Sequence, residues 1–270
     1  MNTGPGSGLL DIVRCESGSV VGRAYAASPL CLLTPRNHGH AAWVYTGSLG
    51  GGLVGGDRFR LNVRVGPDAS AFVSTQASTK VYRSPEGTSA GVEATVAAGG
   101  QLVLWPDPVV CFAQSRYEQR QDFELEHGAS LVAVDCMTSG RRGSGERWRF
   151  ERYSSRLTVR YDGRLVLLDS VALSEDEGPL AIRMGRFDVL CTVVVIGERL
   201  GLHVERMLAD IRSRPMERCA DRLIGAAPLA NLGCLVRIAG RSVEDVGRVV
   251  RGLLSFVSCL LGDDPWARKW

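Results

Sequence analysis

The sequence predicts a mainly β protein that ends in two α-helices. Between residues 19 and 196 the chain repeats short segments in which apolar and polar residues alternate, the period of a half-buried strand. Turn signals separate these segments, among them residues 66–68 (GPD), 99–100 (GG) and 162–163 (DG). This spacing favours an all-β sandwich, barrel or coil of strands over alternating strands and helices.

A glycine-rich loop follows the strand predicted at residues 41–46. Residues 50–55 satisfy the GxGxxG pattern of dinucleotide-binding proteins, but that pattern requires a following helix to hold the pyrophosphate. Residues 58–65 (RFRLNVRV) alternate strictly and predict a strand instead. We therefore expect a packed crossing point of the backbone, where glycines allow close approach, that presents one carboxylate, Asp57.

The later part of the chain contains a hairpin signal and two helical patterns. Residues 161–164 (YDGR) are typical of a two-residue type I′ turn. A first helix is expected near residues 200–212 and a second near 243–261, where a long apolar stripe follows the candidate N-cap Ser242. Residues 234–238 between them predict a returning strand.

Composition excludes several classes of protein. The net charge of +3 is too small and too dispersed for nucleic acid binding. The chain opens without a signal-peptide pattern, and its apolar runs are too short to span a bilayer. The eight cysteines show no CxxC or zinc-type spacing, which fits a reducing, cytoplasmic compartment. Four of them lie in apolar runs and are expected to be small buried side chains: Cys31, Cys111, Cys191 and Cys259.

Candidate polar sites are few, and most have two interpretations. Residues 74–83 (STQASTKVYR) are either a solvated edge strand or a polar lining. Asp135 and Asp169 each end a strongly apolar strand, where a carboxylate either caps a turn or lies at a cavity. Residues 139–146 (SGRRGSGE) are either an anion-binding loop or mobile surface. His38 and His40 have no third ligand in view, so a surface loop is favoured over a metal site.

Four segments in register resemble the urease accessory protein family UreD, called UreH in some organisms. They are residues 51–57 (GGLVGGD), 74–83, 105–108 (WPDP) and 140–146 (GRRGSGE), and their order and spacing match over roughly residues 20–170. The residues that carry the match include Gly51, Gly52, Gly55, Gly56, Gln76, Lys80, Tyr82, Arg83, Gly140, Arg141 and Glu146. The apolar residues 109–111 replace a more proline-rich pattern, and the first 20 residues offer no motif that anchors them to the family.

The resemblance implies a maturation factor that is not an enzyme, built as a helix-like coil of many short strands with two late helices. It implies binding to the urease apoprotein and to UreF, which recruits the GTPase UreG, with no nucleic acid or membrane partner. Nickel would pass in transit through an internal tunnel, without a permanent cofactor or stable metal ligation. On the matching positions, Asp57, Thr79, Asp135 and, least firmly, Asp169 correspond to residues in or beside that tunnel.

We expect one UreD-like domain over residues 1–270, with residues 1–20 as candidates for disorder. A conduit for nickel should use sparse carboxylates and hydroxyls, because thiolates or histidine clusters would trap the ion. Two alternatives remain at this point. One is a β-rich small-molecule enzyme with Asp57, Asp135 and Glu146 as acid–base groups. The other is a protein-interaction scaffold without a metal role.

Overall fold

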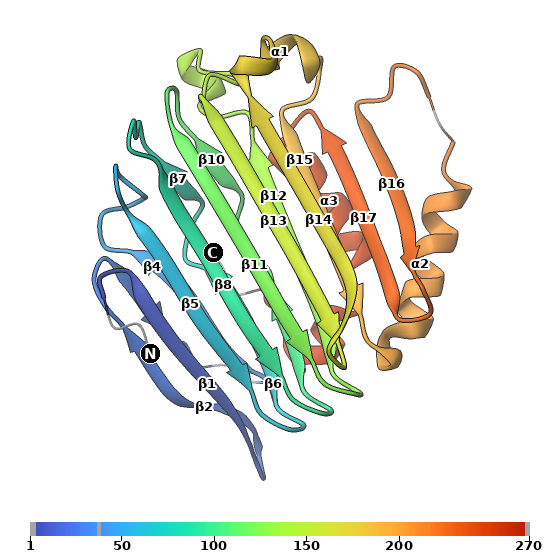
Figure 1. The fold of residues 1–270 in the computed structure, drawn as a ribbon. Coiled ribbons are helices and arrows are strands. Elements are labelled where there is room, and N and C mark those ends of the chain that lie inside the picture. Colours follow the sequence, from blue (N-terminus) through green and yellow to red (C-terminus); the bar gives the residue numbers. More distant parts are fainter. Residues whose placement is uncertain (1–3, 37–38, 216, 268–270) are drawn as a thin grey trace.

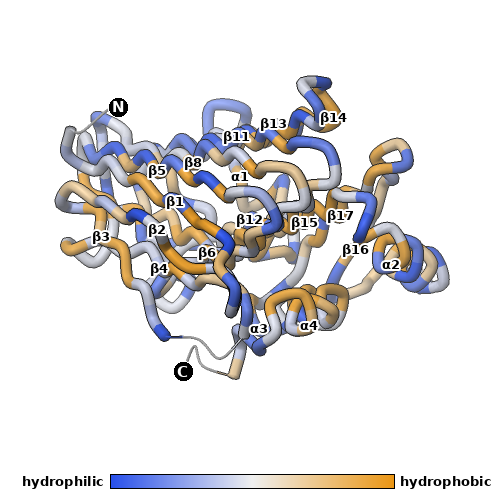
Figure 2. Tube along the Cα trace, turned by 90° about the horizontal axis from the view of Figure 1, so that it is seen from below, coloured by the Kyte–Doolittle hydropathy of each residue, from blue (hydrophilic) through white to orange (hydrophobic). Residues whose placement is uncertain are grey.

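Two β-sheets packed face to face, with helices on the outer face of one of them, form the structure in Figures 1 and 2. It is a computed structural model that describes residues 4–36, 39–215 and 217–267. Sheet A has the strand order β14–β13–β11–β8–β5–β1–β2, and sheet B has the order β16–β17–β15–β12–β9–β6–β4–β3. Two short strands, β10 and β7, attach to sheet B through β12.

The elements have the following bounds. Sheet A contains β1 (Ser7–Cys15), β2 (Gly18–Ala26), β5 (Arg58–Val65), β8 (Thr88–Val96), β11 (Arg116–Leu125), β13 (Arg152–Tyr161) and β14 (Arg164–Ser174). Sheet B contains β3 (Leu30–Leu33), β4 (Ala42–Ser48), β6 (Ser70–Thr75), β7 (Thr79–Val81), β9 (Gln101–Leu104), β10 (Val109–Cys111), β12 (Ser130–Thr138), β15 (Val189–Ile196), β16 (Arg222–Leu229) and β17 (Gly233–Gly240). The helices are α1 (Leu180–Arg183), α2 (Gly201–Ser213), α3 (Val243–Leu253) and α4 (Val257–Leu261), with 3-10 turns at Arg142–Ser144, Glu175–Glu177 and Glu198–Leu200.

The chain coils between the two sheets. From β4 to β13 it alternates between sheet B and sheet A, and each strand pairs in parallel with the strand one turn earlier, as in β5–β8–β11–β13 and β4–β6–β9–β12. The remaining strands return as antiparallel neighbours: β14 on β13, and β15, β17 and β16 beyond β12. The mainly β fold and the coil of strands are therefore confirmed.

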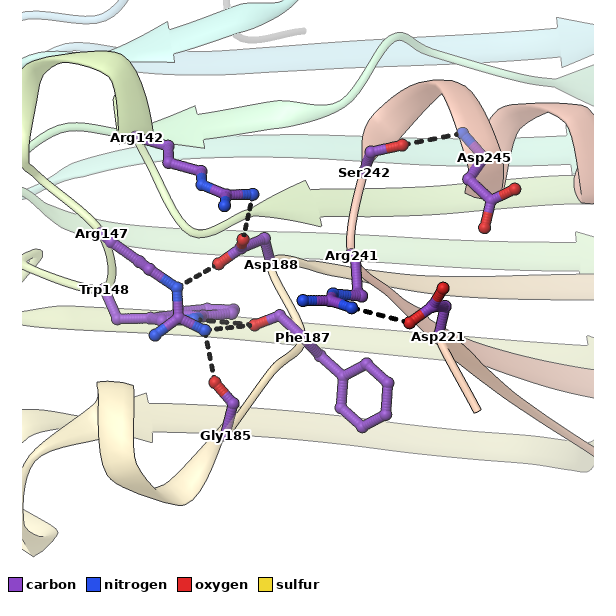
Figure 3. Close-up of polar contacts among 10 residues, drawn as sticks. All are labelled: Arg142, Arg147, Trp148, Gly185, Phe187, Asp188, Asp221, Arg241, Ser242 and Asp245. Carbon is purple, nitrogen blue, oxygen red and sulfur yellow. Dashed lines mark hydrogen bonds and ion pairs between the residues drawn. The ribbon is translucent and has the colours of Figure 1, made fainter. Parts of the chain in front are cut away.

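Local predictions hold where the sequence pattern was strong. The strand after the glycine loop is β5, and Asp162 and Gly163 have φ of 49° and 71°, as a type I′ turn requires. Helix α2 lies where the first helix was predicted. The second predicted helix is interrupted after Leu253, where Leu254 leaves helical geometry with φ −103° and ψ 22°. Ser242 caps α3 by accepting a 3.1 Å hydrogen bond from the Asp245 amide, the pair joined in Figure 3.

Three predictions need correction. Residues 7–15 form β1, so the expectation of disorder over the first 20 residues is wrong for this stretch. Helix α1 and strand β16 were not predicted, because α1 has one turn and β16 contains Gly225 and Pro228, which weaken a strand pattern. Cys191 is bonded to Cys136 in a disulfide between directly opposed residues of β12 and β15, which departs from the expected reduced cysteines. Cys31 is only half-buried and Cys259 is exposed, so the expectation of buried cysteines is wrong for these two.

Apolar side chains fill the space on both sides of sheet B. Between the sheets lie residues such as Val63, Phe123 and Leu131, while Val134 and Val193 face the helices. Figure 2 shows α3 and α4 beneath sheet B, with the strands of sheet A on its opposite side. In the part of the chain that is described, no helix has the length and apolar character to cross a membrane.

Candidate functional site

A cavity of about 250 Å³ lies between sheets A and B. At one side its lining includes exposed residues of the segment between β6 and β7, among them Gln76 and Ala77. At the other side it includes buried groups, among them Gln121, which is only 3% exposed. The cavity therefore joins an open mouth to the interior of the sandwich.

Strand β11 places two amides inside the protein. Its inward face carries Tyr117, Gln119, Gln121, Phe123 and Leu125 at every second position, and the intervening residues are more exposed. In the parallel ladder with β13, Gln119 lies beside Ser155. Asp135 faces these residues from β12, since it follows the inward-facing Leu131 and Ala133 at the same period. The strict two-residue period of β11 is the signal from which both amides could have been predicted.

A chain of hydrogen bonds connects these side chains across the cavity. Ser155 Oγ donates to Asp135 Oδ2 at 2.8 Å, and Tyr117 Oη donates to Gln119 Oε1 at 3.1 Å. Gln119 Nε2 lies 3.5 Å from Ser155 Oγ. By contrast, the buried Oε1 of Gln121 has no hydrogen-bond partner in the described part of the protein. One buried acceptor in the cavity lining therefore has no partner among the described protein atoms.

Burial raises the pKa of Asp135. Hydrogen bonds from Gln119 and Ser155 oppose this effect, and the nearby charge of Asp169 adds to it. The pKa values of Tyr117 and Tyr153 are also raised, chiefly because both hydroxyls are buried. The carboxyl group of Asp135 therefore retains its proton to higher pH than an exposed aspartate would. A cation that approached it would compete with that proton.

The mouth of the cavity has its own carboxylate. The Asp107 amide donates a 2.8 Å hydrogen bond to Thr75 Oγ1, and both residues line the cavity. Thr79, one of the predicted tunnel residues, also lines this side and is half-buried. Asp107 was not singled out from the sequence, although it lies within the WPDP segment that contributed to the family resemblance.

Of the four predicted tunnel residues, Thr79 and Asp135 line the cavity, whereas Asp57 and Asp169 do not. Asp57 Oδ2 accepts a 2.9 Å hydrogen bond from the Val54 amide, so this half-buried carboxylate caps its own turn. Asp169 is 8% exposed and forms an ion pair with Arg237, which ties β14 to β17. Its position is interior, but its charge is already paired.

The glycine loop is packed at one end and open at the other. A Cβ on Gly52 would lie 2.6 Å from Lys80 O and 2.7 Å from the Tyr82 ring, so the predicted close approach is confirmed there. Gly55 is exposed, and a Cβ on it would meet only Glu86, at 3.9 Å. The expectation of tight packing is therefore wrong at Gly55. Gly51 and Gly56 have φ of 70° and 84°, which glycine adopts most readily.

The arginines of the loop at residues 139–146 form ion pairs with carboxylates. Arg141 pairs with Glu146, whose Oε2 also accepts a hydrogen bond from the Ala113 amide at 3.1 Å. The hydrogen bond from Arg141 lowers the pKa of Glu146. In Figure 3, Arg142 and Arg147 both point to Asp188. Residues 141–145 are exposed, and both arginines of the loop are paired with carboxylates, so no unpaired arginine in the loop supports the anion-binding interpretation.

The remaining motif residues lie around the packed end of the glycine loop. Lys80 and Arg83 are exposed, and Tyr82 makes an edge-to-face contact with Phe112 at 5.0 Å between ring centroids. Gly140 has φ of 100°, and a Cβ there would lie 2.6 Å from Cys111 O. None of these four residues lines the cavity, and they do not form an active-site constellation.

The described residues contain no group of three or more histidine, cysteine, aspartate or glutamate side chains placed to hold a metal ion. His40 Nε2 forms a 2.8 Å hydrogen bond with Leu260 O. His38 lies outside the residues that the structure describes. Cys136 borders the cavity, but its sulfur is in the disulfide with Cys191.

Comparison with known proteins identifies the family. The profile of the UreD urease accessory protein family matches residues 5–270. The chain belongs to the UreD family. It is 54% identical to "Urease accessory protein UreD" of Sorangium cellulosum (strain So ce56), over 98% of this chain and 84% of that protein. UreD of Anaeromyxobacter sp. (strain Fw109-5) is 43% identical over 97% of this chain and 89% of its own length.

A plant relative belongs to the same family. "Urease accessory protein D" of Oryza sativa subsp. indica is 31% identical over 96% of this chain and 95% of its own. Membership of the UreD family supports a role in urease maturation, and the relatives are named as accessory proteins rather than as enzymes.

Proposed function

We propose that this protein is a non-catalytic urease maturation factor that helps to deliver nickel to the urease apoprotein in the cytoplasm. It would bind the apoprotein together with UreF, and UreG would join through UreF. Nickel is then cargo in transit, so the protein needs no permanently bound cofactor. Family membership supports the urease role, and the cavity between the sheets supports the path for nickel.

The observation that carries the nickel hypothesis is the chemistry of the cavity lining. Its polar side chains offer oxygen atoms from Thr75, Thr79, Asp107, Gln121 and Asp135. Among the described residues, the lining includes no histidine and one cysteine, Cys136, whose sulfur is bonded to Cys191. Nickel ranks high in the affinity order of divalent metals, so thiolates or imidazoles would retain it. Scattered oxygen atoms admit the ion and also release it, as a conduit requires.

The raised pKa of Asp135 suits the same role. Burial favours the neutral form of this carboxyl group, because a neutral group costs less to bury than a charge. A divalent cation would displace the proton and bind the carboxylate without a second acidic ligand. Such binding is weak and pH-dependent, which favours onward transfer.

The enzyme alternative has less support from the geometry. Asp57, Asp135 and Glu146 were the candidate acid–base groups. Asp57 caps the turn at Val54, and Glu146 is paired with Arg141, so neither lines the cavity that contains Asp135. The titratable groups near Asp135 include the buried Tyr117, whose pKa is raised, and Asp169, whose charge is paired with Arg237, so neither is placed as an acid–base partner.

The test compares nickel delivery with complex assembly. The chain is co-expressed with urease subunits, UreF and UreG, and we measure the nickel content of urease and the amount of assembled complex. Asp135→Asn should lower the nickel content while the complex still forms. The matched control is Glu118→Gln, because Glu118 is an exposed carboxylate on the outer face of β11. If the complex forms but this protein has no effect on the nickel content of urease, the scaffold alternative is favoured. Absence of a complex would contradict the proposed function.

A further inference from the structure

Strand β14 ends sheet A and leaves one backbone edge without a strand partner in the described part of the chain. It is eleven residues long and pairs with β13 alone. An unpaired edge presents a row of amide and carbonyl groups to any extended chain that approaches it. An edge of this length can pair with several residues of another strand.

The other strands at the ends of the two sheets carry features that discourage pairing. Strand β2 contains Gly18 and Gly22 and has an irregular register with β1. Strand β3 has only four residues, and β16 contains Gly225 and Pro228. Strand β14 has neither glycine nor proline, although its register with β13 shifts once, and its central charge, Asp169, points inward and is paired with Arg237. Among these ends, β14 is the longest strand and contains no glycine or proline.

Sheet B extends beyond β14. Figure 1 shows β17 and β16 lying past the edge of sheet A, with no strand of sheet A in front of them. Arg237 of β17 reaches Asp169 of β14, so its side of β17 is the side that faces sheet A. Residues directly opposite in the β16–β17 ladder, and residues two positions away, share that side. We call this set the shelf: Leu223, Gly225, Ala227, Leu235, Arg237 and Ala239.

The shelf is apolar and accessible. Leu223 is 44% exposed, and Gly225 and Ala227 are also exposed. Arg237 is its one charged residue, and that charge is paired with Asp169. The opposite-facing residues of β16, Ile224 and Ala226, pack against the helices instead. The shelf is therefore a sheet face that lacks the covering layer which the rest of sheet B has.

The open edge and the shelf fit a single occupant. Neighbouring strands in a sheet are about 4.8 Å apart, so a strand that pairs with β14 would lie directly above the shelf. We propose that an extended, uncharged apolar segment of a partner protein adds to β14 and covers the shelf. Backbone hydrogen bonds to β14 would give affinity, and alternate side chains of the segment would contact Leu223 and Ala227. An uncharged segment fits, because the shelf offers no free charge.

A second copy of this chain fits less well. Twofold antiparallel pairing of β14 with its own copy would make one continuous sheet A, with the two B sheets on the same side. The second sheet B would then have to occupy the space where β17 and β16 already project. The projection leaves room for one or two strands and not for a second sandwich. A segment from a different protein avoids this overlap.

This inference rests on the proposed function, because the partner that supplies the segment is one of the proteins that assemble with this chain during urease maturation. The test uses the full chain with purified urease apoprotein and, separately, with purified UreF. Ala227→Lys places a charge on the shelf at an exposed position, where the isolated fold should tolerate it. Leu223→Lys is a second variant of the same kind. The matched control is Thr95→Lys, an exposed position on the outer face of β8.

We expect both shelf variants to weaken binding to one of the two partners at least tenfold, while Thr95→Lys binds like the wild type. Hydrogen exchange of peptides over residues 164–174 should slow in that complex, because the free amides of β14 gain acceptors. Wild-type binding to both partners by the shelf variants, with unchanged exchange in β14, would overturn the inference and leave the proposed function intact. Failure of the wild type to bind either partner would overturn both. A dimer of the isolated chain that Ala227→Lys dissociates would show that the occupant is a second copy and would also overturn it.

Discussion

Ser155 on β13 donates a 2.8 Å hydrogen bond to Asp135 on β12, and this contact joins the two sheets across the cavity. Asp135 is thereby held by a neutral donor and not by an arginine, as Asp169 and Asp188 are. A neutral donor orients the carboxyl group without fixing it in the charged form. This arrangement leaves Asp135 able to exchange its proton for a cation.

The first prediction concerns the stability and pH dependence of Asp135. Its pKa is raised in the folded protein, so the folded state binds more protons than the unfolded state between the usual and the raised pKa. The stability that the protonated group provides is present below the usual pKa and is lost as pH rises through the raised one. Asp135→Asn should therefore unfold at the same or a higher temperature than the wild type, with a difference that grows with pH over this window.

Thermal unfolding at several pH values measures that difference, and nickel content of urease measures the function. The same variant should load less nickel at every pH, because an amide binds the ion more weakly than a carboxylate does. Glu118→Gln provides the control for loss of an exposed carboxylate. Lower stability of Asp135→Asn at neutral pH would show that the carboxylate is structural and that the burial argument is wrong.

The second prediction concerns the unpaired oxygen of Gln121. Gln121→Met removes a buried acceptor without a partner and keeps a side chain of similar length. The free energy of unfolding should stay the same or rise by about 1 kcal/mol, since an unsatisfied buried group costs stability. If Gln121 Oε1 contacts the ion in transit, the nickel content of urease should fall with the amount of assembled complex unchanged. Normal nickel loading in this variant would exclude Gln121 from the path.

The sequence predicted the strands and helices better than the site. Strict alternation defined β5, and the DG pair defined the β13–β14 turn, because both patterns depend on local backbone geometry. Strand β16 escaped prediction, since its place in sheet B is set by pairing with β17 and by packing on α2 rather than by its own residues. A local sequence pattern does not contain information about such pairing and packing with distant parts of the chain.

Asp57 shows why the site was harder to predict. A carboxylate in a glycine loop can line a cavity or cap a turn, and only the position of the Val54 amide distinguishes the two. Asp135 was ambiguous in the same way, and the neighbouring strands decided it. The two-residue period of β11 predicts that Gln119 and Gln121 face inward, but nothing in that segment shows which strands lie opposite them. The cavity lining was therefore determined by pairing between strands of separate coil turns, as Gln119 pairs with Ala90, 29 residues earlier, and with Ser155, 36 residues later.

The third prediction follows from the cap at Asp57. Asp57→Ala removes one hydrogen bond at a half-buried turn and should lower the free energy of unfolding by about 0.5–1 kcal/mol. Nickel content per assembled complex should remain at the wild-type level, because Asp57 lies outside the cavity lining. Chemical denaturation and metal analysis of the purified complex check the two parts. Loss of nickel with a fully assembled complex would place Asp57 on the path after all.

The last prediction compares two glycines of the same loop. Gly52→Ala should destabilise the protein by about 1–3 kcal/mol, because the new Cβ would press on the Lys80 carbonyl and the Tyr82 ring at distances well below contact. Gly55→Ala is the matched control, with the same change of residue at an exposed position where the Cβ meets only the end of the Glu86 side chain. Its effect should stay within about 0.5 kcal/mol, as for other exposed substitutions. Denaturation midpoints of the two variants measure the difference directly, and equal midpoints would contradict the packed crossing at Gly52.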